Sequence, residues 1–342
     1  MKSLFFLLHG DHPTLPAGEV KAILEAEEAP YKLRETLPQV LRCTLDQAYV
    51  PRVLGRAYMT RLCAEELFAV EDDPTEILST LDDALTHHPR IRDGFSLTLH
   101  RVQQSAQDID LKALKHRSVE TIRRRTGAEV DAEKPSTSFI GVFSGGFFLF
   151  GRLLAETPQK RLIERRPSSR PFFHPAALQP KLAGCMVNLT RVSPGEMLLD
   201  PFCGAGSILI EAGLLGCRAV GIDVDPRMVE GSRMNLLHYG VKDFLLRADA
   251  RRLPMNRVDA VATDPPYGRS ATTKGLTPRA LLEEFFWSVV ELLHPKGYLC
   301  AAASSDLGLS DLGGEVGLKV VESHLIRVHG SLTRELAVFR RI

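Results

Sequence analysis

A glycine-containing turn between an apolar strand and an apolar helix constrains this chain more than any other feature. Residues 197–199 predict a short buried strand, and residues 208–210 predict the start of a helix. Asp200, Gly204 and Gly206 lie between them. Small residues in such a connection let a ligand approach backbone N–H groups closely. The stretch therefore predicts a nucleotide-like cofactor site in an α/β fold.

The residues around this turn narrow the cofactor class. No Lys followed by Ser or Thr comes after the turn, as a phosphate-binding P-loop requires, and Leu209 stands where a dinucleotide fingerprint has its third small residue. Asp200 at the strand end would repel a pyrophosphate, whereas it suits an amino group. The turn therefore disfavours ligands that are held by a chain of phosphates.

Three further strand ends carry carboxylates. Asp223 ends the next predicted strand and is placed to accept hydrogen bonds from ribose hydroxyls. Asp249 and Ala250 form a third acidic turn, which is placed for an adenine amino group. A fourth predicted strand, residues 258–263, leads into Asp264. Because the carboxyl ends of parallel strands meet at one rim, we expect these residues to surround one ligand.

This order of motifs resembles the S-adenosylmethionine (SAM) methyltransferases, and Asp264-Pro265-Pro266-Tyr267 resembles the signature of those that methylate exocyclic amines. The chemistry needs the amine nitrogen to be oriented and its lone pair to be localised. We expect Asp264 to accept one N–H, the Pro265 carbonyl to accept the other, and Tyr267 to stack on the base. The expected cofactor contacts are Asp200, Phe202, Gly204, Gly206, Asp223, Asp249 and Ala250, and the resemblance adds Phe173 and His174.

The rest of the C-terminal half continues the α/β alternation. Residues 281–293 predict a helix, residues 298–303 a strand, and residues 316–328 and 335–341 two β-rich stretches. The resemblance implies the Rossmann-like, seven-stranded class I sheet, with its last strand antiparallel.

The N-terminal half predicts a smaller α+β region. Residues 56–66 are expected to begin as a strand and continue as a helix, residues 111–125 predict a helix, and residues 139–150 predict a hairpin. Residues 118–131, followed by Lys134-Pro135 and the hairpin, resemble a THUMP domain, an RNA-binding module of tRNA-modifying enzymes. That family uses the module to hold the acceptor end of tRNA.

Basic residues supply the candidate RNA contacts. The net charge is only +1, so RNA binding must come from local patches. Arg123, Arg124 and Arg125 end the helix at 111–125, where they form either a solvated helix end or a face for RNA phosphates. Arg334 is expected either to approach the RNA or the target base, or to form part of a polar hairpin end.

Composition and proline positions suggest four segments. These are an N-terminal α+β (ferredoxin-like) region at 1–55, the THUMP-like domain at 56–152, a basic linker at 153–170 and the methyltransferase domain at 171–342. The linker is expected to be a solvated connector, an RNA contact or both.

Together the two halves look like the archaeal-type tRNA (guanine-10, N2)-methyltransferases over nearly the whole chain. The resemblance implies a SAM-dependent enzyme that forms N2-methylguanosine and, in archaeal members, often the dimethylated base. The alternatives are a guanine N2-methyltransferase for another tRNA or ribosomal RNA position, an RNA-binding subunit that needs a small activating protein, and a DNA adenine methyltransferase, which the THUMP-like half disfavours. A nucleophilic Cys203, as in a pyrimidine C5-methyltransferase, is disfavoured because the amine route is complete without it.

Composition places few further limits. The apolar runs are far shorter than the roughly 20 residues that span a bilayer, and residues 4–8 predict a strand rather than a secretion signal. The six cysteines include no Cys-x-x-Cys pair, so neither a metal site nor a disulfide frame is expected. We expect a cytoplasmic protein with tRNA as its partner, and neither DNA nor a membrane.

Overall fold

The computed structural model describes residues 1–342 except 87–93, 159, 243, 267–276 and 330–331. Contacts divide the chain into two compact units. Unit 1 comprises residues 1–17, 29–55 and 60–157, and unit 2 comprises residues 18–28, 56–59 and 158–342. Two short N-terminal segments therefore belong to the unit that holds most of the C-terminal half. The four-segment division stays a prediction.

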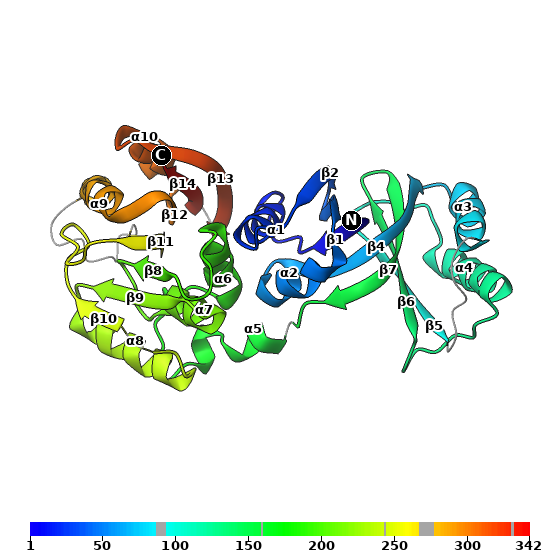
Figure 1. The fold of residues 1–342 in the computed structure, drawn as a ribbon, viewed down its shortest axis with the longest axis horizontal. Coiled ribbons are helices and arrows are strands. Elements are labelled where there is room, and N and C mark those ends of the chain that lie inside the picture. The colour runs from blue at the N-terminus through cyan, green and yellow to red at the C-terminus, as the bar shows by residue number, and fades with distance from the viewer. Residues whose placement is uncertain (87–93, 159, 243, 267–276, 330–331) are drawn as a thin grey trace. The chain divides into compact units, whose positions relative to one another are not determined.

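Unit 1 is built on a seven-stranded sheet in the order β2-β3-β1-β4-β7-β6-β5, and Figure 1 labels its strands except β3. β5 and β6 are parallel, and the other neighbours are antiparallel. Strands from before and after residue 56 thus share one sheet. The strands are β1 (Lys2–Leu8), β2 (Tyr31–Leu37), β3 (Val40–Leu45), β4 (Thr60–Glu71), β5 (Phe95–Arg101), β6 (Thr137–Ser144) and β7 (Phe147–Glu156), and the helices are α2 (Val50–Arg56), α3 (Pro74–Thr86) and α4 (Leu111–Thr126).

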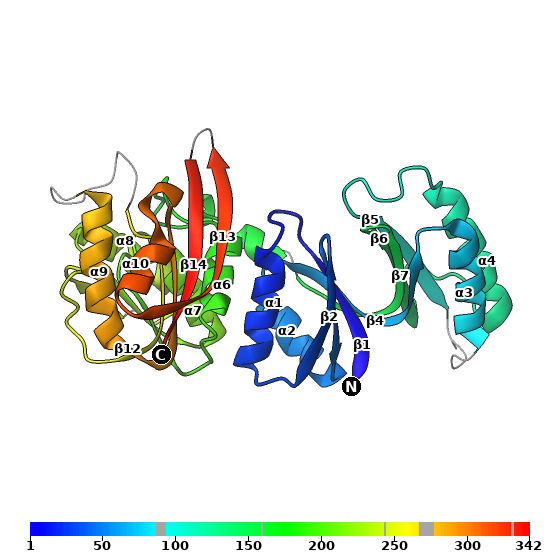
Figure 2. The same cartoon turned by 90° about the horizontal axis from the view of Figure 1, so that it is seen from above.

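Helices α3 and α4 cover the β5–β6–β7 end of this sheet (Figure 2). Their apolar faces, which include Leu81 and Ile122, pack against phenylalanines of the strands. Phe139 and Phe150 are stacked with ring centroids 5.3 Å apart. Gly127, at φ +75°, ends α4 in the left-handed conformation. The predicted helix over residues 111–125 and the predicted hairpin are confirmed.

The expected change from strand to helix within residues 56–66 is wrong. α2 ends at Arg56, and β4 then runs as a strand through Glu65. Glu65 forms ion pairs with Lys2 on β1 and with Arg152 on β7, both at 2.6 Å. Cross-strand pairing of this kind overrides the helical preference of glutamate.

Unit 2 is built on a second seven-stranded sheet, in the order β10-β9-β8-β11-β12-β14-β13. β14 is antiparallel to β12 and β13, while the other neighbours are parallel. The predicted seven-stranded sheet with a reversed last strand is confirmed. The strands are β8 (Met197–Asp200), β9 (Arg218–Asp223), β10 (Phe244–Arg247), β11 (Val258–Thr263), β12 (Leu293–Ser304), β13 (Leu318–His329) and β14 (Leu332–Arg341).

Helices cover both faces of this second sheet (Figures 1 and 2). One face carries α6, α7 and α8, and the other carries α9 and α10, whose phenylalanines and leucines share a core with the central strands. The helices are α1 (Leu15–Ala26), most of which belongs to this unit, α5 (Lys160–Glu164), α6 (Pro180–Leu189), α7 (Ser207–Leu215), α8 (Pro226–His238), α9 (Pro278–Leu292) and α10 (Leu309–Glu315). Among the described residues, every helix is too short or too polar to span a bilayer.

Candidate functional site

The acidic residues expected at one rim do lie at one rim of the second sheet. Asp200 ends β8, Asp223 ends β9, Asp249 follows β10, and Asp264 follows β11. These strands are neighbours and parallel, in the order β10-β9-β8-β11. Their carboxyl ends therefore form a single edge, where open α/β sheets bind ligands.

Asp200 is the most buried carboxylate of this rim, with 2% of its surface exposed. Its Oδ1 accepts hydrogen bonds from the Thr263 hydroxyl at 2.8 Å and from the Phe202 backbone N–H at 3.2 Å. Burial, helped by the charges of Asp264 and Asp223, raises the pKa of Asp200 to about 7. Burial disfavours the ionised form of this carboxylate, so a cationic or amino ligand beside it would stabilise that form strongly.

The turn after Asp200 is shaped by two glycines in the left-handed region, Gly204 at φ +49° and Gly206 at φ +80°. A Cβ on Gly206 would lie 2.4 Å from Ser232 Oγ, so this position needs glycine. The Gly204 N–H donates to Asp223 Oδ2 at 3.0 Å, which ties the turn to the end of β9. Open space lies where a Gly204 Cβ would stand. The turn fits a cofactor that lies close against its backbone.

Asp223 keeps acceptor capacity for a ligand. Its Oδ1 accepts the Asp225 N–H at 2.8 Å, and its Oδ2 accepts the Gly204 N–H. The two carboxylate oxygens together have four lone pairs, so the carboxylate can still accept a hydroxyl donor. Burial raises the pKa of this carboxyl.

Asp249, the third acidic position, differs from Asp200 and Asp223 because an arginine side chain already bonds it. Asp249 is held by Arg251, whose Nε and Nη2 donate to it at 2.9 and 2.7 Å. Ala250 is buried, and the Phe202 ring meets Phe285 edge-on at 5.3 Å. A role of Asp249, Ala250 and Phe202 in cofactor binding stays a prediction.

The motif expected to bind the target amine, residues 264–267, begins at Asp264, directly after Thr263. Its Oδ2 lies 3.6 Å from Arg334 Nη2, and only 15% and 13% of the two side chains are exposed. Pro265 is buried. Tyr267 lies outside the described residues, so its stacking role stays a prediction. The pairing of Arg334 with Asp264 had no signal in the local sequence.

Cys203 lies inside the cofactor turn with 4% exposure. Its N–H donates to the Ile222 carbonyl at 2.9 Å. Burial raises the pKa of its thiol, which leaves little of the thiolate that a nucleophile requires. The disfavoured nucleophilic role therefore gains no support from this geometry.

The segment ahead of α6 lies beside the turn. Asn235 of α8 bonds both the backbone of Phe172 and the Ala205 carbonyl. Phe173 follows with 56% exposure, and His174 Nδ1 accepts the Ala176 N–H at 3.3 Å. That Phe173 and His174 contact the cofactor stays a prediction.

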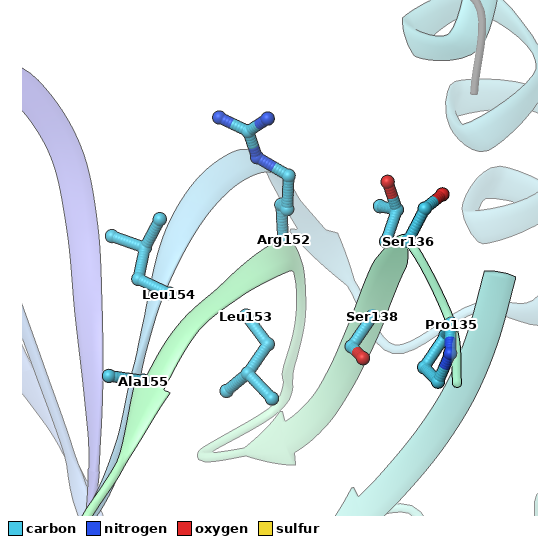
Figure 3. Close-up of a pocket in the computed structure, with 8 residues that line it drawn as sticks. Pro135, Ser136, Ser138, Arg152, Leu153, Leu154 and Ala155 are labelled. Carbon is cyan, nitrogen blue, oxygen red and sulfur yellow. The ribbon is translucent and has the colours of Figure 1, made fainter. Parts of the chain in front are cut away.

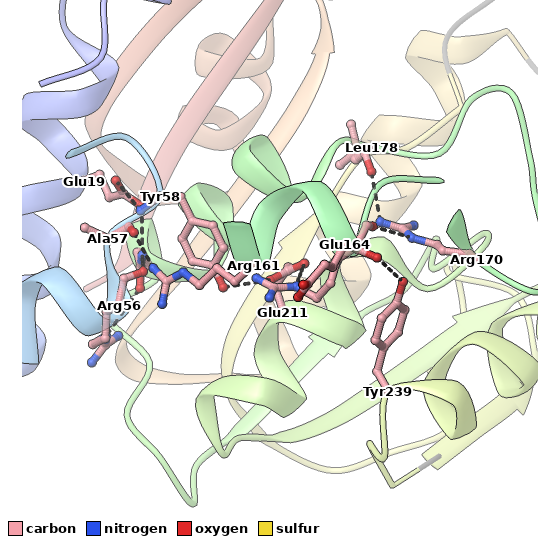
Figure 4. A network of polar contacts seen from close by, with 12 residues as sticks. Glu19, Arg56, Ala57, Tyr58, Arg161, Glu164, Arg170, Leu178, Glu211 and Tyr239 are labelled. Carbon is pink, nitrogen blue, oxygen red and sulfur yellow. Dashed lines mark hydrogen bonds and ion pairs between the residues drawn. The ribbon is translucent and has the colours of Figure 1, made fainter. Parts of the chain in front are cut away.

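Two arginines of the expected linker are not solvated. Arg165 pairs with Glu211 at 2.8 Å. Arg170 is 5% exposed, and it donates to the Leu178 carbonyl at 3.4 Å (Figure 4). Sequence reasoning assigned this run to solvent or RNA because arginine-rich, proline-broken stretches are ordinarily exposed. Their partners on α7 lie far away in the sequence, so no local signal could have shown them.

The candidate RNA arginines at the end of α4 all face carboxylates. Arg123 pairs with Glu129 at 2.7 Å, Arg124 pairs with Asp82 at 2.8 Å, and Arg125 also bonds Asp82. The Arg125 and Arg124 guanidinium groups lower the pKa of Asp82 to about 2. RNA binding by these arginines stays a prediction.

Unit 1 also has an open hollow of about 400 Å³ beside β6 and β7 (Figure 3). Ser136 and Ser138 line it together with Arg152. Arg152 already donates to Glu65 at 2.6 Å. The acidic rim, by contrast, belongs to unit 2.

Known proteins resemble the chain over its whole length. Residues 167–335 match the family described as RMKL-like, methyltransferase domain. A tRNA (guanine(10)-N2)-dimethyltransferase of Methanothermobacter thermautotrophicus is 38% identical over 350 residues, covering 99% of each chain. The protein of the same name from Pyrococcus abyssi is 35% identical over 331 residues, covering 94% of each.

A solved structure supports the fold. TrmN from Thermus thermophilus matches with a TM-score of 0.56 and 21% identity, covering 99% of this chain and 100% of that one. At this identity the likeness establishes the architecture alone. The expected α/β architecture is confirmed.

Proposed function

The chain belongs to the tRNA (guanine(10)-N2)-dimethyltransferase family, and from this premise we propose that it methylates N2 of guanosine 10 in tRNA. It is a SAM-dependent methyltransferase. The relatives' name leads us to propose two successive transfers on the same nitrogen. Cytoplasmic tRNA is the proposed substrate.

One hydrogen bond carries the proposal at the level of the site. Thr263, the residue before Asp264, donates to Asp200 in the cofactor turn at 2.8 Å. This bond joins the ends of the neighbouring strands β8 and β11. It therefore fixes the spacing between Asp200, proposed for the cofactor, and Asp264, proposed for the amine. Transfer between a bound cofactor and an amine requires such a fixed spacing.

Asp264 and Pro265 would activate the amine. The lone pair of an exocyclic amine is delocalised into the purine ring, which makes the nitrogen a poor nucleophile. A carboxylate and a carbonyl that each accept an N–H turn the nitrogen and localise its lone pair. The Pro265-Pro266 pair fixes φ and lacks N–H donors that would compete for these acceptors.

SAM, when bound, supplies an electrophilic methyl group on its sulfonium. Transfer of this methyl group to the nitrogen lone pair would leave S-adenosylhomocysteine as the second product. Asp264 would receive the proton that the nitrogen loses. After one transfer a single N–H remains, and one acceptor then suffices to orient the amine.

Asp200 and Asp223 would hold the methionine part and the ribose of the cofactor. The buried Asp200 suits the amino group of the methionine part, and Asp223 suits the ribose hydroxyls. Unit 1 would hold the tRNA acceptor end, as its THUMP resemblance implies, with Arg123, Arg124 and Arg125 near phosphates.

Nucleoside analysis with site mapping tests this function. We expect purified protein, SAM and an unmodified tRNA transcript to give N2-methylguanosine and then N2,N2-dimethylguanosine at position 10. A transcript with adenosine at position 10 should stay unmethylated. Methylation of that control at another guanosine would overturn the assignment of the target. Activity that appears only after a small protein is added would support the partner-dependent alternative.

A further inference from the structure

Arg170 is bonded to the end of the cofactor turn, the connection between β8 and α7 at residues 200–207. It is 5% exposed, and its Nη1 donates to the Ser207 hydroxyl at 2.6 Å, at the first residue of α7. Its other donors reach the carbonyls of Arg165 at 3.1 Å and Leu178 at 3.4 Å (Figure 4). One guanidinium thus joins the start of α7 to two points of the segment 165–178. A planar fork with several donors is suited to this task.

Asn235 holds the same turn from α8. It is fully buried, and its Nδ2 donates to the carbonyls of Ala205 at 2.9 Å and Phe172 at 3.0 Å. Its Oδ1 accepts the Phe172 N–H at 2.9 Å. A Cβ on Gly231 would lie 2.2 Å from the Phe172 ring, so the ring packs directly on α8. The segment 165–178 is therefore clamped to the turn at a second place.

A third contact fixes α7 one turn further on. Arg165 donates from Nε and Nη2 to the two carboxylate oxygens of Glu211, at 3.0 and 2.8 Å. The Tyr58 hydroxyl donates to the same carboxylate at 2.8 Å (Figure 4). Glu211 is fully buried, so its charge depends on these partners. α7 is thus tied to the segment 165–178 through Ser207 and Glu211.

The turn needs such bracing because of its composition. Gly204 and Gly206 both adopt positive φ, and glycine loses more conformational freedom on ordering than other residues. A ligand that had to order the turn itself would bind more weakly by that cost. Buried side chains that already fix the turn remove the cost before binding.

We propose that Arg170 and Asn235 are positioning residues that pre-organise the SAM-binding turn by clamping it to the segment 165–178. The proposal rests on the proposed function, because it takes the turn as the cofactor site. It assigns two basic-linker arginines, Arg165 and Arg170, to the cofactor side of the reaction rather than to RNA.

Calorimetric titration of the full-length chain with SAM tests the proposal. Arg170→Met and Asn235→Asp should each raise the Kd for SAM about 10-fold, because the turn becomes looser. At saturating SAM we expect kcat and the KM for tRNA to stay within about 2-fold. Arg170→Lys should behave like Arg170→Met, since a lysine keeps the charge but loses the fork.

Two further variants sharpen the test. Ser207→Ala removes one acceptor of Arg170 and leaves the arginine in place. If Arg170→Met melts at a much lower temperature than wild type, the Kd of Ser207→Ala for SAM tests the role of the Arg170–Ser207 bond instead. Arg166→Ala changes an exposed arginine of the same basic run and should leave the Kd for SAM at the wild-type value.

The outcomes separate this proposal from the function. Wild-type SAM affinity in Ser207→Ala and Asn235→Asp would overturn the positioning role while the function stood. A raised KM for tRNA in Arg170→Met and Arg166→Ala alike, with SAM affinity unchanged, would assign the run to RNA and overturn the proposal as well. A wild-type chain that does not bind SAM would refute the proposed function itself.

Discussion

Arg334 Nη2 lies 3.6 Å from Asp264 Oδ2, although Asp264 directly follows β11 and Arg334 lies in β14, far away in the sequence. β14 pairs antiparallel with β12, where Arg334 faces Ser304, and β12 runs parallel to β11, which ends at Thr263. The antiparallel strand β14 thereby places the Arg334 guanidinium at the rim where the amine would bind. We infer that Arg334 orients the Asp264 carboxylate, a different role from the contact with the RNA or the target base expected from the sequence.

The first prediction concerns Asp264 itself. Asp264→Ala should lower kcat about 100- to 1,000-fold, because the N–H of the amine loses its charged acceptor. The Kd for SAM should change little, since the expected cofactor carboxylates are Asp200 and Asp223. Single-turnover methylation of tRNA and titration with SAM measure the two effects separately.

Asp264→Asn is the matched control. Its amide keeps a neutral carbonyl acceptor, so we expect a loss of activity smaller than that of the alanine variant. Equal loss of SAM binding and methyl transfer in Asp264→Ala would show that this residue serves the cofactor instead.

The second prediction concerns Arg334. Arg334→Ala should lower kcat about 10- to 100-fold, because a mobile Asp264 carboxylate is misplaced for much of the time. The KM for tRNA and its dependence on salt should stay close to wild type. Arg327→Ala, at an exposed arginine of β13, serves as the control. A raised KM for tRNA with a shallower salt dependence would instead make Arg334 a phosphate contact.

The rim could be predicted because each of its residues is marked by a local pattern. Asp200, Asp223 and Asp264 each follow a short apolar run that predicts a strand, and parallel strands place such residues at one edge. Arg170 and Asn235 had no such mark. Both are polar residues in polar or mixed surroundings, and their meaning comes only from partners brought near by the fold.

The N-terminal half shows the same limit from another side. Glu65 favours a helix when only its sequence neighbours are considered, yet it lies in β4 between Lys2 and Arg152. Tyr58 likewise looks like part of the N-terminal half, but its hydroxyl bonds Glu211 in unit 2. Contacts with residues distant in the sequence determine the structure at both positions. A single sequence does not show such contacts.

The third prediction follows from the pKa of Asp200, which burial raises to about 7 from an ordinary value of 3.8. The unfolded chain then binds fewer protons than the folded chain between these values, so stability falls as pH rises from about 4 to about 7. Each unit of pKa shift corresponds to about 1.4 kcal/mol. Melting temperatures of the cofactor-free protein across this pH range measure the slope.

Asp200→Asn should remove that slope, because the neutral amide keeps an acceptor for Thr263 without a buried charge. We expect the variant to melt higher than wild type at pH 8, and to bind SAM about 10-fold or more weakly through loss of the charge. An unchanged pH dependence in this variant would mean that another group titrates.

The fourth prediction concerns Tyr58, whose hydroxyl donates to the fully buried Glu211 at 2.8 Å. Tyr58→Phe should lower the free energy of unfolding by about 1–3 kcal/mol, because a buried carboxylate loses a donor. Tyr49→Phe is the matched control, since that half-buried ring contacts the Arg52 guanidinium through its face. Equal melting curves for the two variants would show that Arg165 alone satisfies Glu211.

The fifth prediction uses Asp82 to decide whether the end of α4 binds RNA. Asp82 pairs with Arg124 and Arg125, and its pKa of about 2 keeps it ionised at neutral pH, so it competes with any phosphate for these guanidinium groups. Asp82→Asn should therefore strengthen tRNA binding about 2- to 10-fold at low salt and steepen the salt dependence. Arg124→Ala should do the reverse. Glu76→Gln removes the same charge from an exposed position on α3 and controls for overall charge. Weaker tRNA binding by Asp82→Asn would mean that the ion pairs serve only to join α3 to α4.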